Sequence, residues 1–331
     1  MNYYIESRVT DPAYNLALEQ FVFDSLDRAN SYIMLWQNHS SIIVGKNQNT
    51  SAEVNASFVN ANNISVVRRL SGGGAVYHDL GNLNYTFITD ASTDNIINIA
   101  VFCKPILEAL NSFGVPAEIK GRNDMTIEDK KISGNAQYIR KGRVLHHGTL
   151  LYDSCTEMLT KALNVSDDKI ESKGIKSIKS RVSNIRPFMK NDMSINEFWD
   201  ALKKHLFIAF EMKEYCLSPS ESAEIQKLRE NRYSKWEWNY GASPAYNIRK
   251  NRRIEGCGNI EILLDVEKHG VIKNAAFFGD FFGNSDTSEL AAYLSGCRLE
   301  YDDLKLKLGS INLSRYFHNI NEDVFISLLL E

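Results

Sequence analysis

A run of three glycines lies between two segments of strand-forming residues and limits how the backbone can fold there. Two valines precede the run, Gly72, Gly73 and Gly74 form it, and Ala75, Val76 and Tyr77 follow it. Glycine reaches positive φ and lets the backbone approach a ligand closely, and successive N–H groups in such a turn form an anion-binding concavity. Arg69 and Ser71 add a charge-assisted donor and a hydroxyl. The segment fits a phosphate or an adenylate; its plainer interpretation is a glycine-rich hairpin turn with surface arginines.

Two familiar nucleotide-binding motifs are absent from this segment. It lacks the GxxxxGK(S/T) pattern of a P-loop, and no GxGxxG opens a helix. The glycine run is therefore neither a P-loop nor a dinucleotide fingerprint.

The composition bounds the class of protein. A chain of 331 residues is long enough for about two domains, and 44% hydrophobic residues can form a core. A net charge of −3 argues against a globally basic nucleic-acid binder. Five cysteines without CxxC spacing favour a reducing compartment over a disulfide framework or a zinc site. Without a signal-peptide pattern or an apolar run of about 18 residues, we expect a cytoplasmic protein that does not contact a membrane.

The pattern of apolar residues and turn signals predicts an α+β architecture. Strands are expected at 3–5, 32–36, 41–44, before and after the glycine run within 64–88, in a meander at 125–152, and in a hairpin at 258–266 and 270–278. Helices are expected after Asp11 and Pro12 and at 53–62, 97–113, 195–210, 220–233, 288–294 and 322–330. Residues 32–36 and 41–44 read as a strand pair. Residues 236–247 read as a packed linker, so we predict a large mixed-sheet domain at 1–247 and a small α/β domain at 248–331.

A second polar segment lies on the predicted meander. Asn123 and Asp124 offer oxygen ligands to a Mg²⁺ that also touches phosphates. Lys131, on the return strand, offers a compact positive charge that can hold a carboxylate against a phosphorus atom. In a regular strand Ile132 faces away from Lys131, so Lys131 and Ser133 share one face. The alternative is a polar hairpin with solvated lysines.

A third segment carries two adjacent histidines, His146 and His147, followed by Gly148. Adjacent side chains on a strand point to opposite faces, so both histidines cannot bind one metal ion. Packing or hydrogen bonding to a substrate is the favoured use.

These segments occur in one order as RRLSGGGAVYHD, GRNDM, KKISGNAQ and HHGTLL. In that order they resemble the lipoate–protein ligase A family, of the biotin/lipoate ligase superfamily. YNLALEQ near the N-terminus, residues 173–185 and WEWN at 236–239 also fit. The resemblance implies a catalytic domain of biotin/lipoate ligase type with a C-terminal accessory domain.

The resemblance implies a two-step reaction with ATP and Mg²⁺. Lipoate or octanoate becomes an acyl-adenylate, and the acyl group then passes to a lysine of an acceptor protein. The implied acceptors are lipoyl domains of 2-oxoacid dehydrogenase complexes or the glycine-cleavage H protein.

The resemblance also implies roles for individual residues. Lys131 would contact the lipoyl carboxylate and the α-phosphate, and His147 and Gly148 would lie near the acyl group. Asp124, with Asn123, would face Mg²⁺. The residues on the ATP side would be Arg69, Ser71, Gly72, Gly73, Gly74, Ala75, Val76 and Tyr77.

A basic segment follows the meander and is rich in lysine and arginine, namely Lys173, Lys176, Lys179 and Arg181. The resemblance implies a mobile loop that closes over the adenylate, and its charge could meet an acidic acceptor domain. The alternative is a solvated loop.

Three other functions compete with the ligase. An octanoyl or lipoyl transferase would need a reactive thiolate, for which Cys155 is the nearest candidate in sequence. A biotin ligase would carry a different glycine loop. A non-catalytic lipoate-binding protein would hold the acid without turnover.

Overall fold

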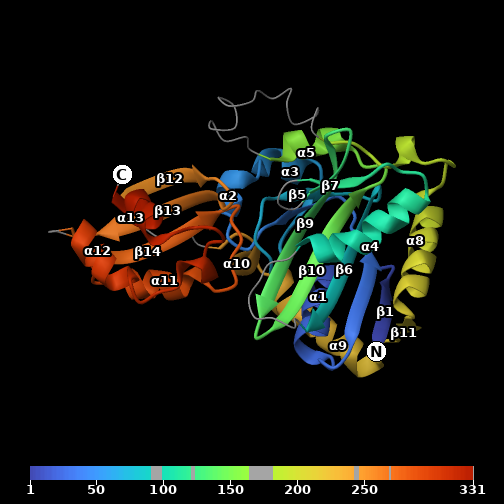
Figure 1. Ribbon diagram of the computed structural model, residues 1–331, viewed down its shortest axis with the longest axis horizontal. Coiled ribbons are helices and arrows are strands. Elements are labelled where there is room, and N and C mark those ends of the chain that lie inside the picture. The colour runs from blue at the N-terminus through green and yellow to red at the C-terminus, as the bar shows by residue number, and fades with distance from the viewer. Residues whose placement is uncertain (91–98, 121–123, 164–181, 242–245, 268–269, 331) are drawn as a thin grey trace. The chain divides into compact units, whose positions relative to one another are not determined.

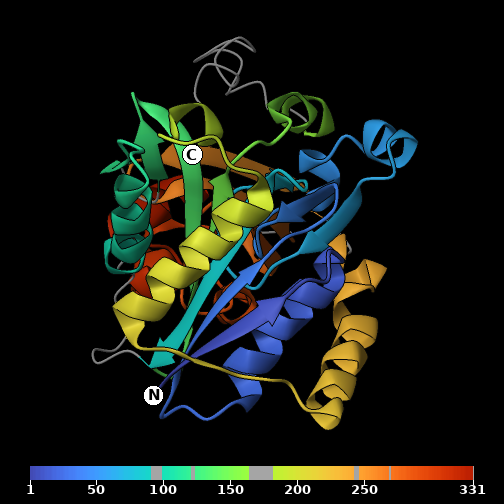
Figure 2. The same cartoon turned by 90° about the vertical axis from the view of Figure 1, so that its right-hand side faces the viewer.

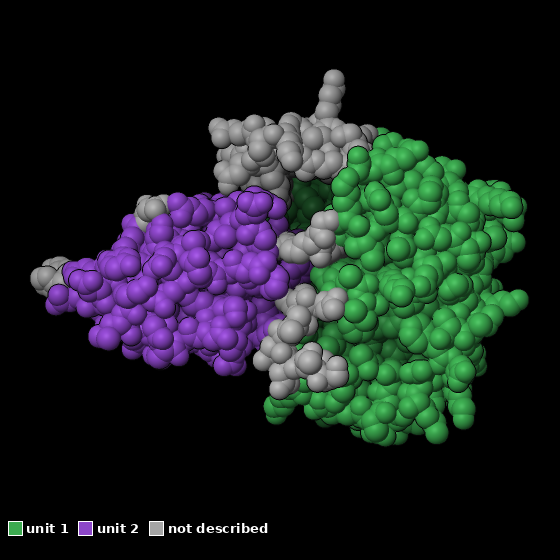
Figure 3. Space-filling view, viewed as in Figure 1, with its two compact units in different colours: residues 1–44, 50–69, 75–239 green, residues 45–49, 70–74, 240–331 purple. Residues whose placement is uncertain are grey.

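The computed structural model describes residues 1–90, 99–120, 124–163, 182–241, 246–267 and 270–330 (Figure 1). The chain divides into two compact units, coloured separately in Figure 3. Unit 1 holds residues 1–44, 50–69 and 75–239, and unit 2 holds residues 45–49, 70–74 and 240–331. The predicted domain boundary at residue 248 remains a prediction. The two units do not divide the chain at a single point, since unit 2 also includes two short earlier segments.

An eight-stranded mixed sheet forms the centre of unit 1. Its order is β11-β1-β2-β6-β10-β9-β8-β7. Strand β1 runs parallel to β2 and β11, and the pairs from β2 to β7 are antiparallel. The strands are β1 (Asn2–Ser7), β2 (Ser31–Trp36), β6 (Asn82–Asp90), β7 (Glu118–Lys120), β8 (Asp124–Ile127), β9 (Lys130–Arg140), β10 (Arg143–Leu151) and β11 (Lys213–Glu214).

Helices cover both faces of this sheet (Figures 1 and 2). Alternate side chains of β2 show the two layers, because Ile33 and Leu35 pack with α4 and α8, while Met34 and Trp36 pack with α1 and α9. These helices are α1 (Pro12–Ser25), α4 (Ile99–Ser112), α8 (Ile195–Phe210) and α9 (Pro219–Leu228). The sheet is therefore the middle layer of unit 1.

A second, three-stranded sheet differs from one predicted strand pair and from the hairpin interpretation of the glycine run. Its order is β4-β3-β5, with β3 (Ser41–Val44) parallel to β4 (Ser65–Arg68) and antiparallel to β5 (Val76–His78). The predicted pair of β2 and β3 is wrong, because the two strands lie in different sheets. The strands on either side of the glycine run do not form a hairpin with each other either, since both pair with β3.

Short elements complete unit 1. The predicted helix at 53–62 is interrupted at Asn55, whose side chain accepts from Phe58 N and so begins a new helix. The elements are α2 (Thr50–Glu53), α3 (Ala56–Ala61), α5 (Thr156–Ala162), the 3₁₀ turn η1 (Arg186–Phe188), the π-helical turn η2 (Arg229–Tyr233) and α10 (Trp236–Asn239). Helices α3 and α5 share a small core with the second sheet.

Unit 2 contains a three-stranded antiparallel sheet in the order β12-β13-β14 and its own hydrophobic core. The predicted hairpin of β13 and β14 is confirmed. Strand β12 was not predicted, because most of its residues are charged and show no apolar–polar alternation. The charged residues are Arg249, Lys250, Arg252 and Arg253. Charged side chains suit an edge strand, since they oppose pairing with another chain. The elements are β12 (Ile248–Ile254), β13 (Gly258–Val266), β14 (Ile272–Gly279), α11 (Thr287–Leu294), α12 (Tyr301–Leu308), η4 (Leu313–Arg315) and α13 (Glu322–Leu330).

Candidate active site

Lys131 lies near the start of β9, and its ammonium is held close to the sheet. Lys131 Nζ is 2.7 Å from Asp124 Oδ1 on the neighbouring strand β8, and both side chains are about one-third exposed, at 33% and 34%. The Asp124 oxygen is itself shielded from solvent, so the ammonium compensates its charge. A β-carbon built at Gly134 would lie 2.9 Å from Lys131 Nζ. The lysine therefore points along the sheet rather than into bulk solvent.

The prediction that Lys131 and Ser133 share a face is wrong. The pairing of β8 with β9 shifts by one residue, because Met125 pairs with Ser133 while Thr126 pairs with Lys131. This β-bulge leaves Ile132 as the extra residue and changes the alternation of side chains. The buried Ser133 accepts a hydrogen bond from the Asn135 side chain. Lys131 instead lies on the face of Gly134.

The main chain of Lys131 is fixed from a second side. Ser183 N donates to Lys131 O at 2.9 Å, and Val182 forms a parallel bridge with Lys131. The predicted loop residues Lys173, Lys176, Lys179 and Arg181 lie outside the described residues, as does Asn123.

The two adjacent histidines point to opposite faces, as predicted. His146 is fully buried and stacks on Phe102 of α4, with ring centroids 5.0 Å apart. Burial lowers the pKa of His146 well below its ordinary value, so this histidine is neutral. His147 Nδ1 lies 3.0 Å from Glu19 Oε1 of α1 on the other face.

Glu19 organises a polar group that the sequence motifs did not reveal. Its Oε1 also accepts from Thr86 Oγ1 at 2.5 Å, and Thr86 Oγ1 accepts from Trp36 Nε1 at 2.9 Å. The side chains of Glu19 and His147 are only 3% and 10% exposed. An acid in the apolar stretch YNLALEQ was the available signal, since a buried carboxylate requires partners. The group is a candidate polar wall for a substrate.

Two more buried basic residues, Arg69 and His78, lie close enough to this group to interact with it electrostatically. Arg69 is buried and donates to Ile43 O at 3.0 Å. Desolvation lowers the pKa of Arg69 to about 10, and nearby Glu19 opposes this shift. Desolvation, with Arg69 and His147 nearby, lowers the pKa of His78 to about 3. Arg69 thus belongs with Glu19, His78 and His147 in the interior of unit 1.

The glycine run belongs to unit 2 and packs against its backbone. A β-carbon at Gly72 would lie 2.4 Å from Phe281 O. Gly73 has φ of 91° and donates to the same oxygen at 3.3 Å, and Ser71 O accepts from Lys46 N at 2.8 Å. Close packing is therefore one reason for glycine here. Ala75, Val76 and Tyr77, the rest of the predicted ATP segment, belong to unit 1.

Cys155, the candidate thiol of the competing transferase, is an exposed free cysteine. Its backbone N donates to Asp79 Oδ2 at 2.8 Å, just before α5. No interaction of its thiol with an activating base is evident in the part of the chain that the structure describes.

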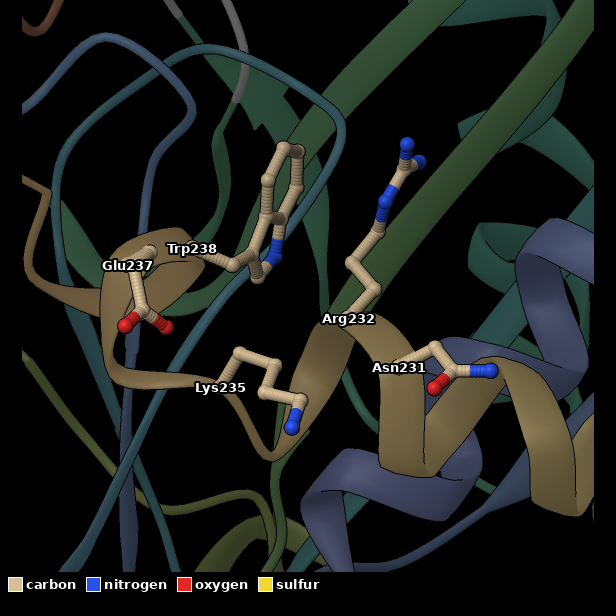
Figure 4. A pocket seen from close by; sticks show the side chains of 5 residues that line it. All are labelled: Asn231, Arg232, Lys235, Glu237 and Trp238. Atoms are coloured by element: carbon tan, nitrogen blue, oxygen red, sulfur yellow. The ribbon is translucent and has the colours of Figure 1, made fainter.

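A depression of about 540 Å³ lies on unit 1 (Figure 4). Its lining residues are Asn231, Arg232, Lys235, Glu237 and Trp238. Arg232 lies over the Trp238 ring at 4.8 Å and donates to Gln20 Oε1. None of the predicted site residues lines this depression, so we assign it no role in the reaction. No helix within the described residues is long and apolar enough to cross a membrane.

Two family models match consecutive parts of the chain. The model described as lipoyl protein ligase A/B catalytic domain matches residues 11–207, and the model described as bacterial lipoate protein ligase C-terminus matches residues 243–329. The chain is 45% identical to a lipoate-protein ligase of Bacillus subtilis, LplJ, over 97% of each chain. It is 43% identical to lipoate–protein ligase 1 of Staphylococcus aureus, over 99% of this chain and 100% of that one.

Solved structures of lipoate-protein ligases are also similar to this chain. LipL1 of P. falciparum in complex with lipoate aligns with a TM-score of 0.82 and 28% identity, covering 100% of this chain and 99% of that one. A bi-partite lipoate protein ligase from Thermoplasma acidophilum, solved with its E2 lipoyl domain, aligns at 0.63 and 28%, covering 75% and 99%. A lipoate-protein ligase A bound with ATP aligns at 0.62 and 26%, covering 73% and 99%.

The fold and these matches define a protein ligase with an α+β catalytic domain followed by a smaller C-terminal domain. The chain belongs to the lipoate–protein ligase family. The resemblance in the sequence motifs is thereby confirmed.

Proposed function

We propose that this protein activates lipoate with ATP and transfers the lipoyl group to a lysine of a lipoyl-domain acceptor. The main support for this function is the 45% sequence identity to a lipoate-protein ligase along 97% of both chains. Solved relatives contain lipoate in one case and ATP in another, which are the two substrates of the first step.

In the first step, a lipoate carboxylate oxygen bonds to the α-phosphorus of ATP and pyrophosphate leaves. We assign Lys131 to the carboxylate and the α-phosphate. Its fixed ammonium would stabilise the negative charge that develops on the phosphoryl oxygens without having to reorient. The contact with Asp124 and the close approach to Gly134 support this role, because they hold the charge at one place on the sheet.

In the second step, the acceptor's lysine amine attacks the acyl carbon and AMP leaves. The ligase supplies position rather than a covalent nucleophile. We propose that His147 and Gly148 line the acyl site. Support comes from His147, which Glu19 holds in one orientation on the same face of the sheet as Gly134.

For ATP, we propose contacts from the segment that the sequence singled out. The residues are Arg69, Ser71, Gly72, Gly73, Gly74, Ala75, Val76 and Tyr77. Gly73 N–H already donates to Phe281 O, so nucleotide contacts through that group require this bond to change.

A magnesium ion fits Asp124 by chemistry, because Mg²⁺ prefers carboxylate oxygens and completes its shell with water and phosphates. No cluster of three His, Cys, Asp or Glu side chains suited to a metal occurs within the described ranges, so Asp124 would act with few other protein ligands. Bound Mg²⁺ would neutralise charge on the phosphates. Asn123 is proposed as the second ligand.

Mass spectrometry of an apo lipoyl domain tests the function. Incubation with this protein, ATP, Mg²⁺ and lipoate should add one lipoyl group to the domain, and omission of ATP should prevent it. Octanoate, lipoyl domains of 2-oxoacid dehydrogenases and the glycine-cleavage H protein are tested in parallel as proposed substrates. Modification without ATP, or none with it, would refute the proposal.

A further inference from the structure

Two residues shape the surroundings of the Lys131 ammonium, and they are partners across β8 and β9. Asp124 pairs with Gly134 in the strand register. Asp124 Oδ1 lies 2.7 Å from Lys131 Nζ. The β-carbon that Gly134 lacks would lie 2.9 Å from both Cε and Nζ of Lys131. The end of the lysine side chain therefore occupies the space that a larger residue at position 134 would fill.

The bulge at Ile132 makes this arrangement possible. Positions 131 and 134 differ by an odd number, so in a regular strand their side chains would face opposite ways. The extra residue brings Lys131 to the face of Gly134. Ile132 anchors the bulge, since it is fully buried in the core beneath α4 and α8.

Among the described carboxylates near Lys131, Asp124 is the one that pairs with its ammonium. Asp129, in the turn between β8 and β9, is paired with Lys120. On the neighbouring strand β10, the uncharged Thr149 hydroxyl accepts from Gly134 N at 3.1 Å. Asp124 is thus the carboxylate that faces the lysine. A substrate carboxylate that binds this ammonium would compete with Asp124 for it.

We propose that Gly134 and Asp124 are positioning residues for Lys131, and that the lipoate carboxylate replaces Asp124 as the ion-pair partner of the lysine. This inference rests on the proposed role of Lys131. One ammonium exchanges one carboxylate for another, so the lysine keeps an anionic partner throughout. Asp124 holds the amine across Gly134 until the acid arrives, and it competes with that acid for the amine.

The first test is Gly134→Ala. The new methyl group would displace the flexible end of Lys131, not the backbone, and alanine suits a strand at least as well as glycine. We expect an unchanged or higher melting temperature, together with lipoate affinity and ATP–pyrophosphate exchange that each fall about tenfold, as for one lost charged contact. Wild-type affinity and exchange would overturn the role of Gly134.

Gly148→Ala is the matched comparison, because Gly148 pairs with Asn135, the residue beside Gly134. Its β-carbon would lie 2.2 Å from Asn135 Oδ1 and 2.5 Å from Tyr85 Oη in the core. We expect this variant to lose thermal stability, which Gly134→Ala should not. Equal loss of stability in both variants would mean that Gly134 serves packing only.

The second test is Asp124→Asn, with lipoate binding measured by calorimetry in the absence of ATP. Removal of the competing charge should tighten lipoate binding about two- to fivefold, the size of a partly exposed ion pair. Unchanged or weaker binding would overturn the exchange. If Lys131→Ala bound lipoate as well as the wild type, the proposed role of Lys131 would itself fail. If Lys131→Ala weakened lipoate binding while Asp124→Asn left lipoate binding unchanged, only the exchange of carboxylates would be refuted.

Discussion

His146 and His147 are neighbours in sequence, yet their side chains have different physical roles. His146 lies in an apolar layer, where its ring stacks on Phe102 and its Nδ1 bonds to Gln137. His147 belongs to the polar group around Glu19. Because alternate faces of one strand meet different layers, His147 and not His146 lies on the face where we propose the substrate binds.

The buried His146 predicts a pH dependence of stability. Its pKa lies well below the ordinary 6.5 in the folded protein, so below pH 6.5 the unfolded chain binds a proton that the folded chain does not. Stability is therefore full above pH 6.5 and falls as the pH drops from there. His146→Phe should reduce this slope by about one proton, roughly 1.4 kcal/mol per pH unit.

Urea unfolding at several pH values between 5 and 7 measures this slope. His78, with a pKa lowered to about 3, remains in the variant, so part of the dependence should persist. A slope identical to that of the wild type would show that His146 does not bear it.

The orientation of single side chains was the part of the site that the sequence could not predict. The motifs identified Lys131, but an alternating pattern placed it with Ser133, and the bulge at Ile132 reverses this. Glu19 had no visible partner, because its contacts with Thr86 and His147 join segments 67 and 128 residues apart. Such contacts depend on tertiary packing rather than on local pattern.

At the scale of elements, helix ends are where local chemistry determines structure. Helix α8 begins with a capping box, in which Ser194 Oγ accepts from Glu197 N and Glu197 accepts from Ser194 N. The apolar side of α8 places Phe198, Trp199 and Leu202 in the core of unit 1. The cap therefore sets the start of a helix that covers the sheet carrying Lys131.

Ser194→Ala should lower the free energy of unfolding by about 1 kcal/mol, because backbone N–H groups at the helix start lose their acceptor. Ser194→Asp should restore most of this loss, since aspartate is an equally good cap. Chemical denaturation of the three proteins provides the comparison. No loss in the alanine variant would contradict the capping role.

Elements with strong local signals were predicted well, and those fixed by distant partners were not. Asp11 and Pro12 indicated the start of α1, and the range predicted for α8 is the range observed. The partner of β3 was mistaken, because sequence proximity favoured β2 while the chain places β3 with β4 and β5. Helix α12 was missed, since only Leu304 and Leu308 of its eight residues are buried.

For the whole molecule, the exposed Cys155 separates two reaction classes. A ligase that forms an acyl-adenylate needs no thiol, whereas a transferase through a thioester does. Cys155→Ser should leave ATP-dependent lipoylation within about twofold of the wild type, as for an ordinary surface substitution. Mass spectrometry of the acceptor domain measures it. Loss of transfer in this variant would favour the transferase.

ATP–pyrophosphate exchange with lipoate measures the first step, in which we propose that Lys131 acts. Lys131→Ala should reduce exchange by about 10²- to 10³-fold, the effect of removing one preorganised charge from a reacting centre. The neighbouring exposed Lys130→Ala is the matched control and should keep its rate. Lys130→Ala should keep the melting temperature of the wild type, whereas Lys131→Ala, which removes the partner of Asp124, should stay folded and lose at most about 4 °C. Normal exchange in a folded Lys131→Ala protein would show that Lys131 does not act in adenylate formation.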